Sequence, residues 1–297
     1  MPDPLAPGLY IVATPIGNLG DITLRALEVL KSADRIACED TRQTQKLLNH
    51  YGIVTPTISY HEHNERDRAA KLIEELKAGA RIAVVSDAGT PGISDPGSVL
   101  IREAIAAGVP VIPIPGPNAA LSALIASGLP TDEFQFIGFL PEKAGARRTR
   151  LEALAEQPRD STHTVILYEA PHRIADTLAD LEAVFGSALH IVAARELTKL
   201  HEEFLRGTIA EVRSELINRD RIRGEFVLLL ELPATSANAG ASPLDSEKRV
   251  SISDQIKRLQ SENNLDEKEA LKRLARESGK SKSELYRELQ RERAKRR

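Results

Sequence analysis

Apolar residues along this chain fall into short β-branched runs, separated by segments in which apolar residues recur at helical spacing. Such runs occur at Leu9–Ala13, Arg35–Cys38, Thr57–Tyr60, Arg81–Val85 and Val109–Ile114. Arg81–Val85 lacks apolar–polar alternation, which is typical of a parallel strand covered on both faces. Helices are predicted after a capping Asp21 and over the charged segment Arg66–Lys77. Strands that alternate with helices predict βαβ units and a parallel-rich sheet.

A second series of the same kind follows a helix predicted from Pro117 to Ser127, with proline in its first turn and Gly128 just after its end. Its predicted strands are Phe134–Phe139, Thr164–Tyr168, Leu189–Ala193 and Phe226–Leu230. The predicted helices between them are Arg148–Ala155, Ile174–Val184 and Ile209–Asn218. The expected class is therefore α/β, with two tandem α/β domains of mainly parallel sheets at residues 1–116 and 117–232.

The pattern changes after residue 232. Residues 233–246 are rich in Ala, Ser, Thr, Asn, Gly and Pro, which predicts a flexible linker. Residues 247–297 are expected to form a small module of three helices. Ile252, Ile256 and Leu259 share one face of the first helix. Asp266 with Glu269 and Ser281 with Glu284 have the spacing of capping boxes that open two more helices. The leucines expected to form its core are Leu271, Leu274, Leu285 and Leu289.

Charge is distributed unevenly between this module and the rest of the chain. Residues 246–297 hold 16 Lys and Arg against 10 Asp and Glu, whereas the whole chain of 297 residues holds 40 and 43. A basic tail on an acidic body favours a polyanionic partner, although a solvated helical appendage without a partner has the same composition. Cys38 is the only cysteine, the start has no secretory signal, and no apolar run is long enough to span a bilayer. We therefore expect a cytoplasmic protein.

Three loops rich in glycine and proline follow predicted strands, at Thr14–Asp21, Ser86–Gly97 and Pro113–Ala119. Glycine lets a ligand approach the backbone closely, and proline fixes the shape of a loop in advance. Each loop alone also fits a tight turn between a strand and a helix. Because ligands bind where parallel strands end, we expect the three loops to converge on one cleft.

Other site motifs are incomplete in this sequence. The first loop lacks the Gly-x-Gly-x-x-Gly spacing of a dinucleotide site, and Gly279-Lys280-Ser281 lacks the strand and first glycine of a phosphate-binding loop. His61-Glu62-His63 has no accompanying ligand cluster, so no metal site is predicted. No serine nucleophile lies in a Gly-x-Ser-x-Gly turn.

Several contiguous sequence segments carry a resemblance to a known family. They are Ala13–Asp21, Glu39–Arg42, Ser86–Gly97, Tyr168–Arg173 and Arg195–Lys199. In them the chain closely resembles the ribosomal RNA small subunit methyltransferase I family, a group of the tetrapyrrole methylases. The resemblance covers residues 8–232. It implies a two-domain fold that binds S-adenosylmethionine between the domains, and a homodimer.

The resemblance also implies site residues. The expected cofactor contacts are Pro15, Asp87, Ala88, Gly89, Thr90, Asn118, Ala119, Glu169, Glu196 and Glu225. The first loop is longer than in the wider family, which leaves Leu19 as the alternative to Pro15. Glutamates replace the Met, Ala or Pro common in those relatives, which indicates a more polar cleft. The candidate catalytic carboxylates are Asp40, Glu169 and Glu196, each with a structural or cofactor-positioning role as the alternative.

By the same resemblance, the substrate is small-subunit rRNA or the assembled small ribosomal subunit, and the acceptor is the ribose 2′-hydroxyl of a cytidine in its decoding region. The side chains expected to hold RNA are Arg42, His61, His63, Asn64, Arg173 and Lys199, together with the basic tail. Two other functions remain open: a tetrapyrrole methylase acting on a small molecule, and a non-catalytic RNA-binding assembly factor.

Overall fold

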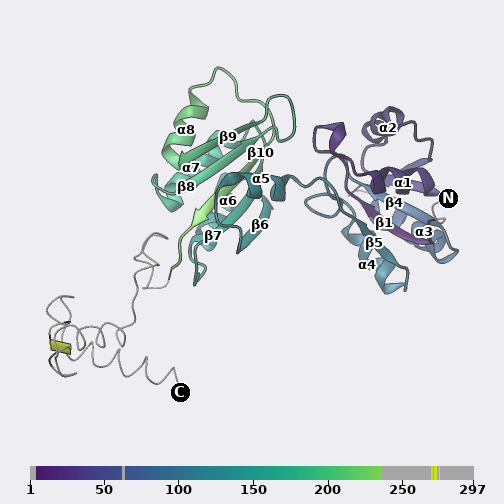
Figure 1. Cartoon of the computed structure of the whole chain (residues 1–297), viewed down its shortest axis with the longest axis horizontal. Coiled ribbons are helices and arrows are strands. Elements are labelled where there is room, and N and C mark those ends of the chain that lie inside the picture. The colour runs from purple at the N-terminus through teal and green to yellow at the C-terminus, as the bar shows by residue number, and fades with distance from the viewer. Residues whose placement is uncertain (1–4, 62–63, 236–268, 270, 273, 275–297) are drawn as a thin grey trace. The chain divides into compact units, whose positions relative to one another are not determined.

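The computed structural model describes residues 5–61 and 64–235, and positions 269, 271, 272 and 274. The chain divides into two compact units, residues 1–236 and 237–297 (Figure 1). In the second unit, Leu271 and Leu274 are helical and buried, at 2% and 7% exposure. Leu285 and Leu289, the capping boxes and most of the predicted module lie outside the described residues, as does His63. The predicted domain boundaries stay a prediction.

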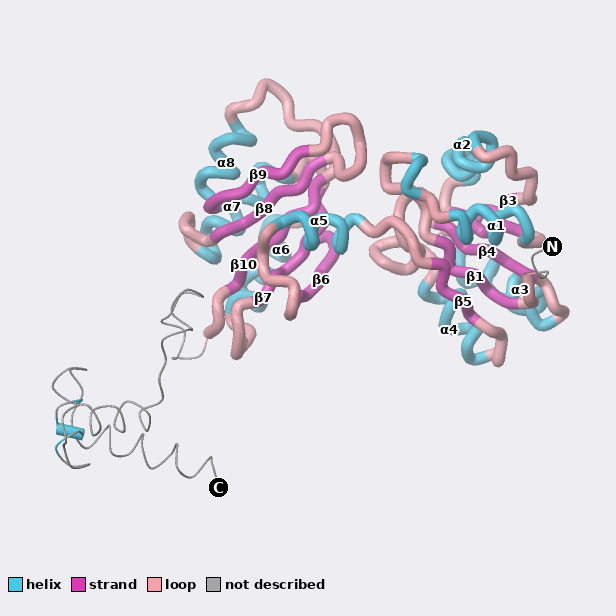
Figure 2. Tube along the Cα trace, in the orientation of Figure 1, coloured by secondary structure: helices cyan, strands magenta, loops and turns pink. Residues whose placement is uncertain are grey.

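The first sheet has the strand order β3-β2-β4-β1-β5, and Figure 2 labels all of these strands except β2. Its strands are β1 (Gly8–Val12), β2 (Arg35–Cys38), β3 (Thr57–Ser59), β4 (Arg81–Val85) and β5 (Val111–Ile114). All its pairings are parallel, as predicted. Its helices are α1 (Leu24–Ser32), α2 (Thr41–His50), α3 (Glu65–Lys77) and α4 (Ser98–Ala106), and a 3₁₀ turn lies at Leu19–Asp21.

Alternate residues of these strands pack into two separate cores, because successive side chains of a strand point to opposite faces. Leu9 and Val84 pack with α3 and α4 on one face, and Tyr10 and Val85 pack with α1 on the other. The strand β4 is therefore covered on both sides, as its lack of alternation predicts.

The second sheet has the order β6-β7-β10-β8-β9. Its strands are β6 (Phe134–Phe139), β7 (His163–Glu169), β8 (His190–Arg195), β9 (Glu203–Thr208) and β10 (Phe226–Leu232). Only β6 and β7 pair in parallel, and the other three pairings are antiparallel. The α/β class is confirmed, but the expectation of mainly parallel pairing is wrong for this sheet. The physical reason is the short connection between β8 and β9, which allows only an antiparallel hairpin.

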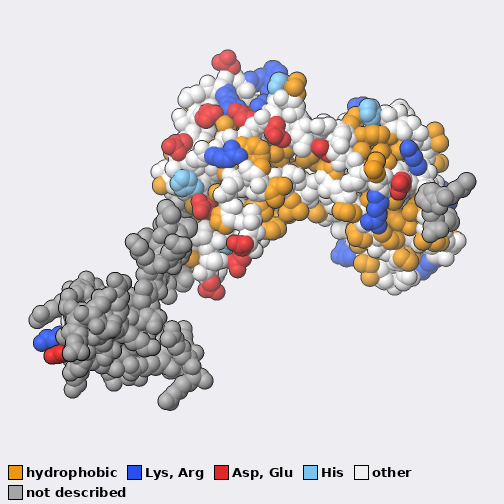
Figure 3. All heavy atoms as spheres, in the orientation of Figure 1, with side chains coloured by type: hydrophobic (Ala, Val, Ile, Leu, Met, Phe, Trp, Pro, Cys, Tyr) orange, Lys and Arg blue, Asp and Glu red, His pale blue; other side chains and the backbone are white. Residues whose placement is uncertain are grey.

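The two faces of the second sheet are covered unequally. The helices α6 (Ala144–Ala155), α7 (Ile174–Phe185) and α8 (Ile209–Ile217) share one core with one face. The helix α5 (Ala119–Ser127) packs on the other face. Asn118 caps α5, so Pro117 precedes the helix instead of lying in its first turn. Apolar patches remain at the surface of residues 5–235, as Figure 3 shows.

Candidate functional site

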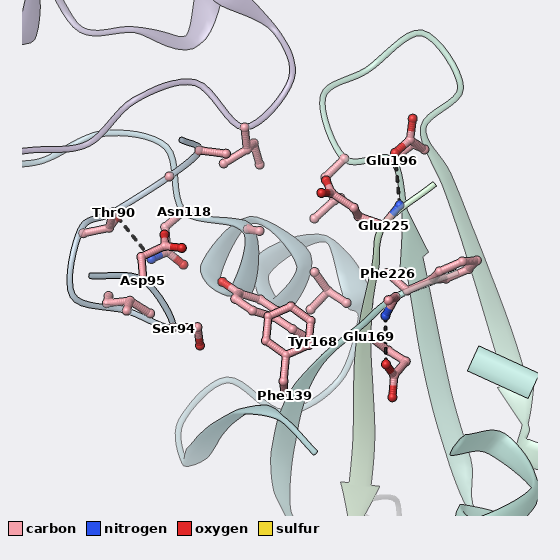
Figure 4. A pocket seen from close by; sticks show the side chains of 18 of the residues that line it. Thr90, Ser94, Asp95, Asn118, Phe139, Tyr168, Glu169, Glu196, Glu225 and Phe226 are labelled. Carbon is pink, nitrogen blue, oxygen red and sulfur yellow. Dashed lines mark hydrogen bonds between the residues drawn. The ribbon is translucent and has the colours of Figure 1, made fainter. Parts of the chain in front are cut away.

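The three glycine- and proline-rich loops meet at one cavity of about 330 Å³ (Figure 4). Ile16 comes from the first loop, Ala88 to Thr90 and Ile93 to Asp95 from the second, and Asn118 and Ala119 from the third. The remaining lining comes from the half of the chain that holds the second sheet: Phe139, Tyr168–Pro171, Glu196, Leu197, Lys199 and Glu225–Val227. The predicted convergence of the loops is confirmed.

Hydrogen bonds between the loops fix the cavity wall. Thr14 and Gly89 exchange two backbone hydrogen bonds, of 2.8 and 3.0 Å. The Thr90 hydroxyl donates to the carbonyl of Pro117 at 3.3 Å, and the Asn118 amide donates to the Thr90 hydroxyl at 3.4 Å. Gly89 lines the cavity with φ +81°, a backbone conformation that favours glycine. These hydrogen bonds hold the three loops together.

Most of the residues predicted to contact a cofactor line this cavity. They are Ala88, Gly89, Thr90, Asn118, Ala119, Glu169, Glu196 and Glu225. Pro15 and Leu19 are not among the lining residues, and Ile16 supplies the first loop's contact instead. Asp87 also lies outside the lining, because its carboxylate accepts the backbone N–H of Asp40 at 3.0 Å.

The Glu169 side chain is turned away from the cavity and is fully buried. It accepts hydrogen bonds from its neighbour Ala170 N–H at 2.8 Å and from the Thr177 hydroxyl at 2.6 Å. Arg173 pairs with it at 3.2 Å. In Figure 4 its carboxylate points away from Tyr168 and Phe139. This carboxylate fixes the start of α7 and has no free lone pair aimed at a substrate, which favours a structural role.

Glu196 and Glu225 hold Lys199 between them on one wall. Lys199 Nζ lies 2.8 Å from Glu196 Oε1 and 3.0 Å from Glu225 Oε2. Burial alone would raise the pKa of the Glu196 carboxyl, but hydrogen bonds from Lys199 and from the Glu225 N–H keep it below its ordinary value. The stem of Lys199 lies over Gly17, where an added Cβ would be 2.3 Å from Lys199 Cγ. Lys199 therefore contacts Glu196 and Glu225 through its ammonium and the first loop through its aliphatic stem.

Asp40 and Arg42 are not among the residues that line the cavity. Asp40 caps α2 by accepting the N–H of Arg42 at 2.8 Å, and it also pairs with the Arg42 guanidinium. That guanidinium is the main cause that lowers the pKa of the Asp40 carboxyl. A capping carboxylate with a depressed pKa is a weak proton acceptor, which favours the structural alternative for Asp40.

Several residues predicted to hold RNA already have ion-pair or hydrogen-bond partners within the chain. Arg173 is committed to Glu169 and to the carbonyl of Leu140 at 2.8 Å, and it borders a second hollow with Phe139 and His172. His61 and Asn64 bind each other, with Asn64 Nδ2 3.1 Å from His61 Nε2. Arg42, Arg173 and Lys199 are each ion-paired within the chain.

The sequence prediction missed Asp95, which lines the cavity from the second loop. Burial and the charge of Glu39 raise the pKa of this carboxyl to about 6. A carboxylate with a pKa near neutrality in a cavity is suited to general base catalysis. Its signal in the sequence was the second aspartate of the loop, in Ser94-Asp95-Pro96.

The sequence prediction also missed an aromatic wall. Tyr168 packs edge-on against Phe136 and Phe139, with ring centroids 5.0 and 5.6 Å apart. Tyr168 and Phe139 line the cavity, where Figure 4 shows both rings. Such a wall offers apolar area and π-faces to a planar ligand.

Backbone strain occurs in two loops at the cavity, residues 86–97 and the connection between β8 and β9. In the described residues, the only non-glycine residues with positive φ are Ser94 (60°), Glu196 (50°) and Thr198 (64°). Two of them line the cavity. Conformations of this kind persist where the surrounding structure enforces them, and they cluster at functional sites.

Other kinds of site find no support in the part of the chain that the structure describes. No group of three His, Cys, Asp or Glu residues there is arranged to hold a metal ion. No helix there combines the length and apolar character needed to cross a membrane.

Comparison of the sequence with known proteins gives a consistent family. Residues 8–213 match the family described as tetrapyrrole (corrin/porphyrin) methylases. The chain is 55% identical over 223 residues to ribosomal RNA small subunit methyltransferase I of Halalkalibacterium halodurans, covering 75% of each chain. It is 49% identical over 253 residues to the protein of the same name from Synechocystis, covering 84% of this chain and 86% of the relative.

Solved structures share the fold at lower identity. Uroporphyrin-III C-methyltransferase from Thermus thermophilus, complexed with S-adenyl homocysteine, matches with TM-score 0.52 and 18% identity, over 75% of this chain and 97% of that one. Diphthine synthase matches with TM-score 0.55 and 17% identity, over 75% and 89%. At these identities the likeness shows the fold.

Proposed function

This chain belongs to the tetrapyrrole methylase family, in its ribosomal RNA small subunit methyltransferase I group, and we propose that it transfers a methyl group from S-adenosylmethionine to small-subunit rRNA. The acceptor we propose is the ribose 2′-hydroxyl of a cytidine in the decoding region. The observation that carries the proposal is the convergence of three glycine- and proline-rich loops on one cavity with an aromatic wall.

The residues of the cavity fit S-adenosylmethionine. Its volume of about 330 Å³ lies within the usual range of small-molecule sites, roughly 300–1,000 Å³. Gly89 lines the cavity without a side chain, and Tyr168 and Phe139 offer apolar faces to a purine. Asp95, Glu196 and Glu225 place three carboxylates in the lining against the single ammonium of Lys199, a negative balance that suits a ligand with two cationic groups. These residues would hold the methyl donor.

S-adenosylmethionine, when bound, supplies a methyl group that is already activated on a sulfonium. The chain's own residues then have to align the acceptor and remove one proton. Alignment alone can supply about 7–11 kcal/mol of a barrier, and a general base adds about 10²- to 10⁴-fold. Asp95 is the carboxylate that we assign to the proton of the ribose hydroxyl, because Glu169 and Asp40 are committed to structural hydrogen bonds and Glu196 is paired with Lys199.

The two alternatives have less support. The relatives at 49–55% identity carry the name of an rRNA methyltransferase, whereas the solved tetrapyrrole enzyme, uroporphyrin-III C-methyltransferase, is 18% identical. A non-catalytic factor would not need a shaped cavity with a carboxyl of raised pKa. Cytoplasmic location, a homodimer, the domain boundaries and RNA binding by the tail remain part of the proposal.

Calorimetry tests the donor site directly. The purified full chain should bind S-adenosylmethionine and S-adenosylhomocysteine with one site per chain. Thr90→Val removes the hydroxyl that joins the second and third loops and should weaken both ligands. Val54→Ala, at an exposed position away from the cavity, is the matched control. Absence of binding by the wild-type chain would refute the methyltransferase proposal and leave the non-catalytic alternative.

A further inference from the structure

Two loops beyond the ends of the second sheet's strands are joined at the cavity wall. Residues 196–202 connect β8 to β9, and residues 218–225 connect α8 to β10. Lys199 from the β8–β9 loop pairs with Glu225 from the α8–β10 loop at 3.0 Å. Backbone hydrogen bonds of 3.0 and 3.1 Å also link Glu196 to Glu225 and Glu202 to Lys199. The two loops therefore form one fixed surface next to the cavity.

The tip of the β8–β9 loop presents apolar and aromatic side chains to solvent. Leu200 is 93% exposed, and the neighbouring His201 is also exposed. The tip is anchored on both sides, since Thr198 N–H donates to the Glu202 carboxylate at 2.6 Å and Thr198 itself has φ +64°. The Thr198 hydroxyl is buried without a hydrogen-bond partner among the described residues. The strained backbone and the unpartnered hydroxyl of Thr198, next to the cavity-lining Lys199, are features that cluster at functional sites.

The α8–β10 loop contributes two arginines that form no ion pair with a carboxylate of the described residues. Arg221 and Arg223 are exposed, and no carboxylate among the described residues forms a salt bridge with either guanidinium. The backbone carbonyl of Arg223 accepts a hydrogen bond from Arg195 Nε at 2.5 Å, which fixes this loop to the end of β8. Asp220 is the exposed carboxylate on the same loop.

These arginines contrast with the cations that the sequence pattern favoured for RNA. Arg173 and Lys199 are 14% and 28% exposed and are bound to glutamates. Moving either onto a phosphate would leave a carboxylate without its partner. Arg221 and Arg223 can contact phosphates without leaving a carboxylate unpaired.

At the upper edge of the half that holds the second sheet, Figure 3 shows Lys and Arg atoms together with a histidine and an apolar side chain. Recognition of single-stranded RNA needs this combination of chemistry, because cations contact phosphates while unstacked bases pack on flat or apolar side chains. We propose that Leu200, His201, Arg221 and Arg223 form a rim that binds the single-stranded rRNA next to the acceptor nucleotide. Leu200 and His201 pack against a base, and the two arginines contact phosphates. The rim rests on the proposed function, since it defines how that same site receives its RNA.

The test measures binding of the full chain to a transcript of the decoding region of small-subunit rRNA over a series of salt concentrations. Each phosphate contact on a single strand contributes roughly 0.7 to the slope of log K against log salt. The double variant Arg221→Gln/Arg223→Gln removes two such contacts and should therefore make the slope shallower by about 1.4. The double variant Leu200→Ala/His201→Ala should weaken binding roughly five- to a hundredfold at an unchanged slope. Asp220→Asn should strengthen binding, because it removes a negative charge from the rim.

Matched controls separate the rim from general effects. Arg102→Gln removes an exposed arginine of α4, and Val54→Ala trims an apolar side chain that is 96% exposed, so both should leave affinity and slope unchanged. Every variant should bind S-adenosylhomocysteine as the wild type does. If the wild type methylates this RNA and the rim variants match its affinity and slope, the rim is overturned and the proposed function stands. Failure of the wild type to bind the donor overturns the proposed function itself.

Discussion

Replacing Asp95 by asparagine should lower activity and raise stability at the same time. The carboxyl lines the cavity, and burial together with the charge of Glu39 raises its pKa to about 6. An asparagine of the same shape cannot accept the proton of a ribose hydroxyl, so the rate of methyl transfer should fall about 10²- to 10⁴-fold. A residue kept only for packing would not produce opposite effects on rate and stability.

The size and pH range of the stability effect follow from the direction of the shift. The folded chain holds the proton of Asp95 more tightly than the unfolded chain, where the pKa is near 3.8. Ionisation of Asp95 therefore lowers the free energy of unfolding. The loss is absent below about pH 4, grows as the pH rises, and is complete above about pH 6. A shift of about two units corresponds to at most roughly 3 kcal/mol, and solvent screening of this partly exposed group reduces it to about 1 kcal/mol.

Urea unfolding of the wild type and Asp95→Asn at pH 4 and pH 8 measures this difference. The variant should be more stable by about 1 kcal/mol at pH 8 and equal to the wild type near pH 4. Wild-type activity at saturating substrate should rise as pH increases through about 6, because the ionised carboxylate is the base. A variant that is less stable at pH 8, or that keeps wild-type activity, would show that the assignment of Asp95 is wrong.

Three further predictions test other parts of the structure. Asp180→Ala leaves the buried Arg147 guanidinium without its carboxylate at 2.7 Å and should cost about 3–5 kcal/mol in urea unfolding at pH 7, whereas Arg148→Ala, which removes the exposed partner, should cost less than about 1 kcal/mol. Gly224→Ala places a Cβ 2.3 Å from Glu196 Cγ at φ +88° and should weaken donor binding in calorimetry by about tenfold or more, while Gly186→Ala, at φ +84° with no atom nearby, has only the backbone strain and should not. Glu169→Gln removes the charge facing Arg173 and should cost about 2 kcal/mol of stability, with methyl transfer per folded molecule preserved; a rate loss of a hundredfold would restore Glu169 as a catalytic candidate.

The position of the site follows from the sequence because parallel strands end at one edge. Leu9–Ala13 and Arg81–Val85 have the pattern of neighbouring buried strands, and the loops after them had to emerge together. Glycine at position 89 and the capping Asn118 carry local information that needs no tertiary context. These features explain why the cavity and most of its backbone contacts were predictable.

The direction of individual side chains did not follow from the sequence. Glu169 ends β7 at the cavity, but its carboxylate turns to Thr177 and Arg173, whose positions depend on how α7 packs. Asp95 gains its raised pKa from burial and from Glu39, which is distant in sequence. The second sheet is mainly antiparallel because β9 returns beside β8, and Glu203–Thr208 has too little apolar alternation to be recognised as a strand.

The most direct measurement of the central claim is reconstituted methyl transfer followed by mass-spectrometric mapping. Small subunits from cells that lack this protein would be incubated with the full chain and S-adenosylmethionine carrying an isotopically labelled methyl group. We expect the label on the 2′-oxygen of a cytidine in the decoding region, and a loss of that label with Asp95→Asn. Label on a base, label on another ribosomal component, or no transfer to rRNA by the wild-type chain would contradict it.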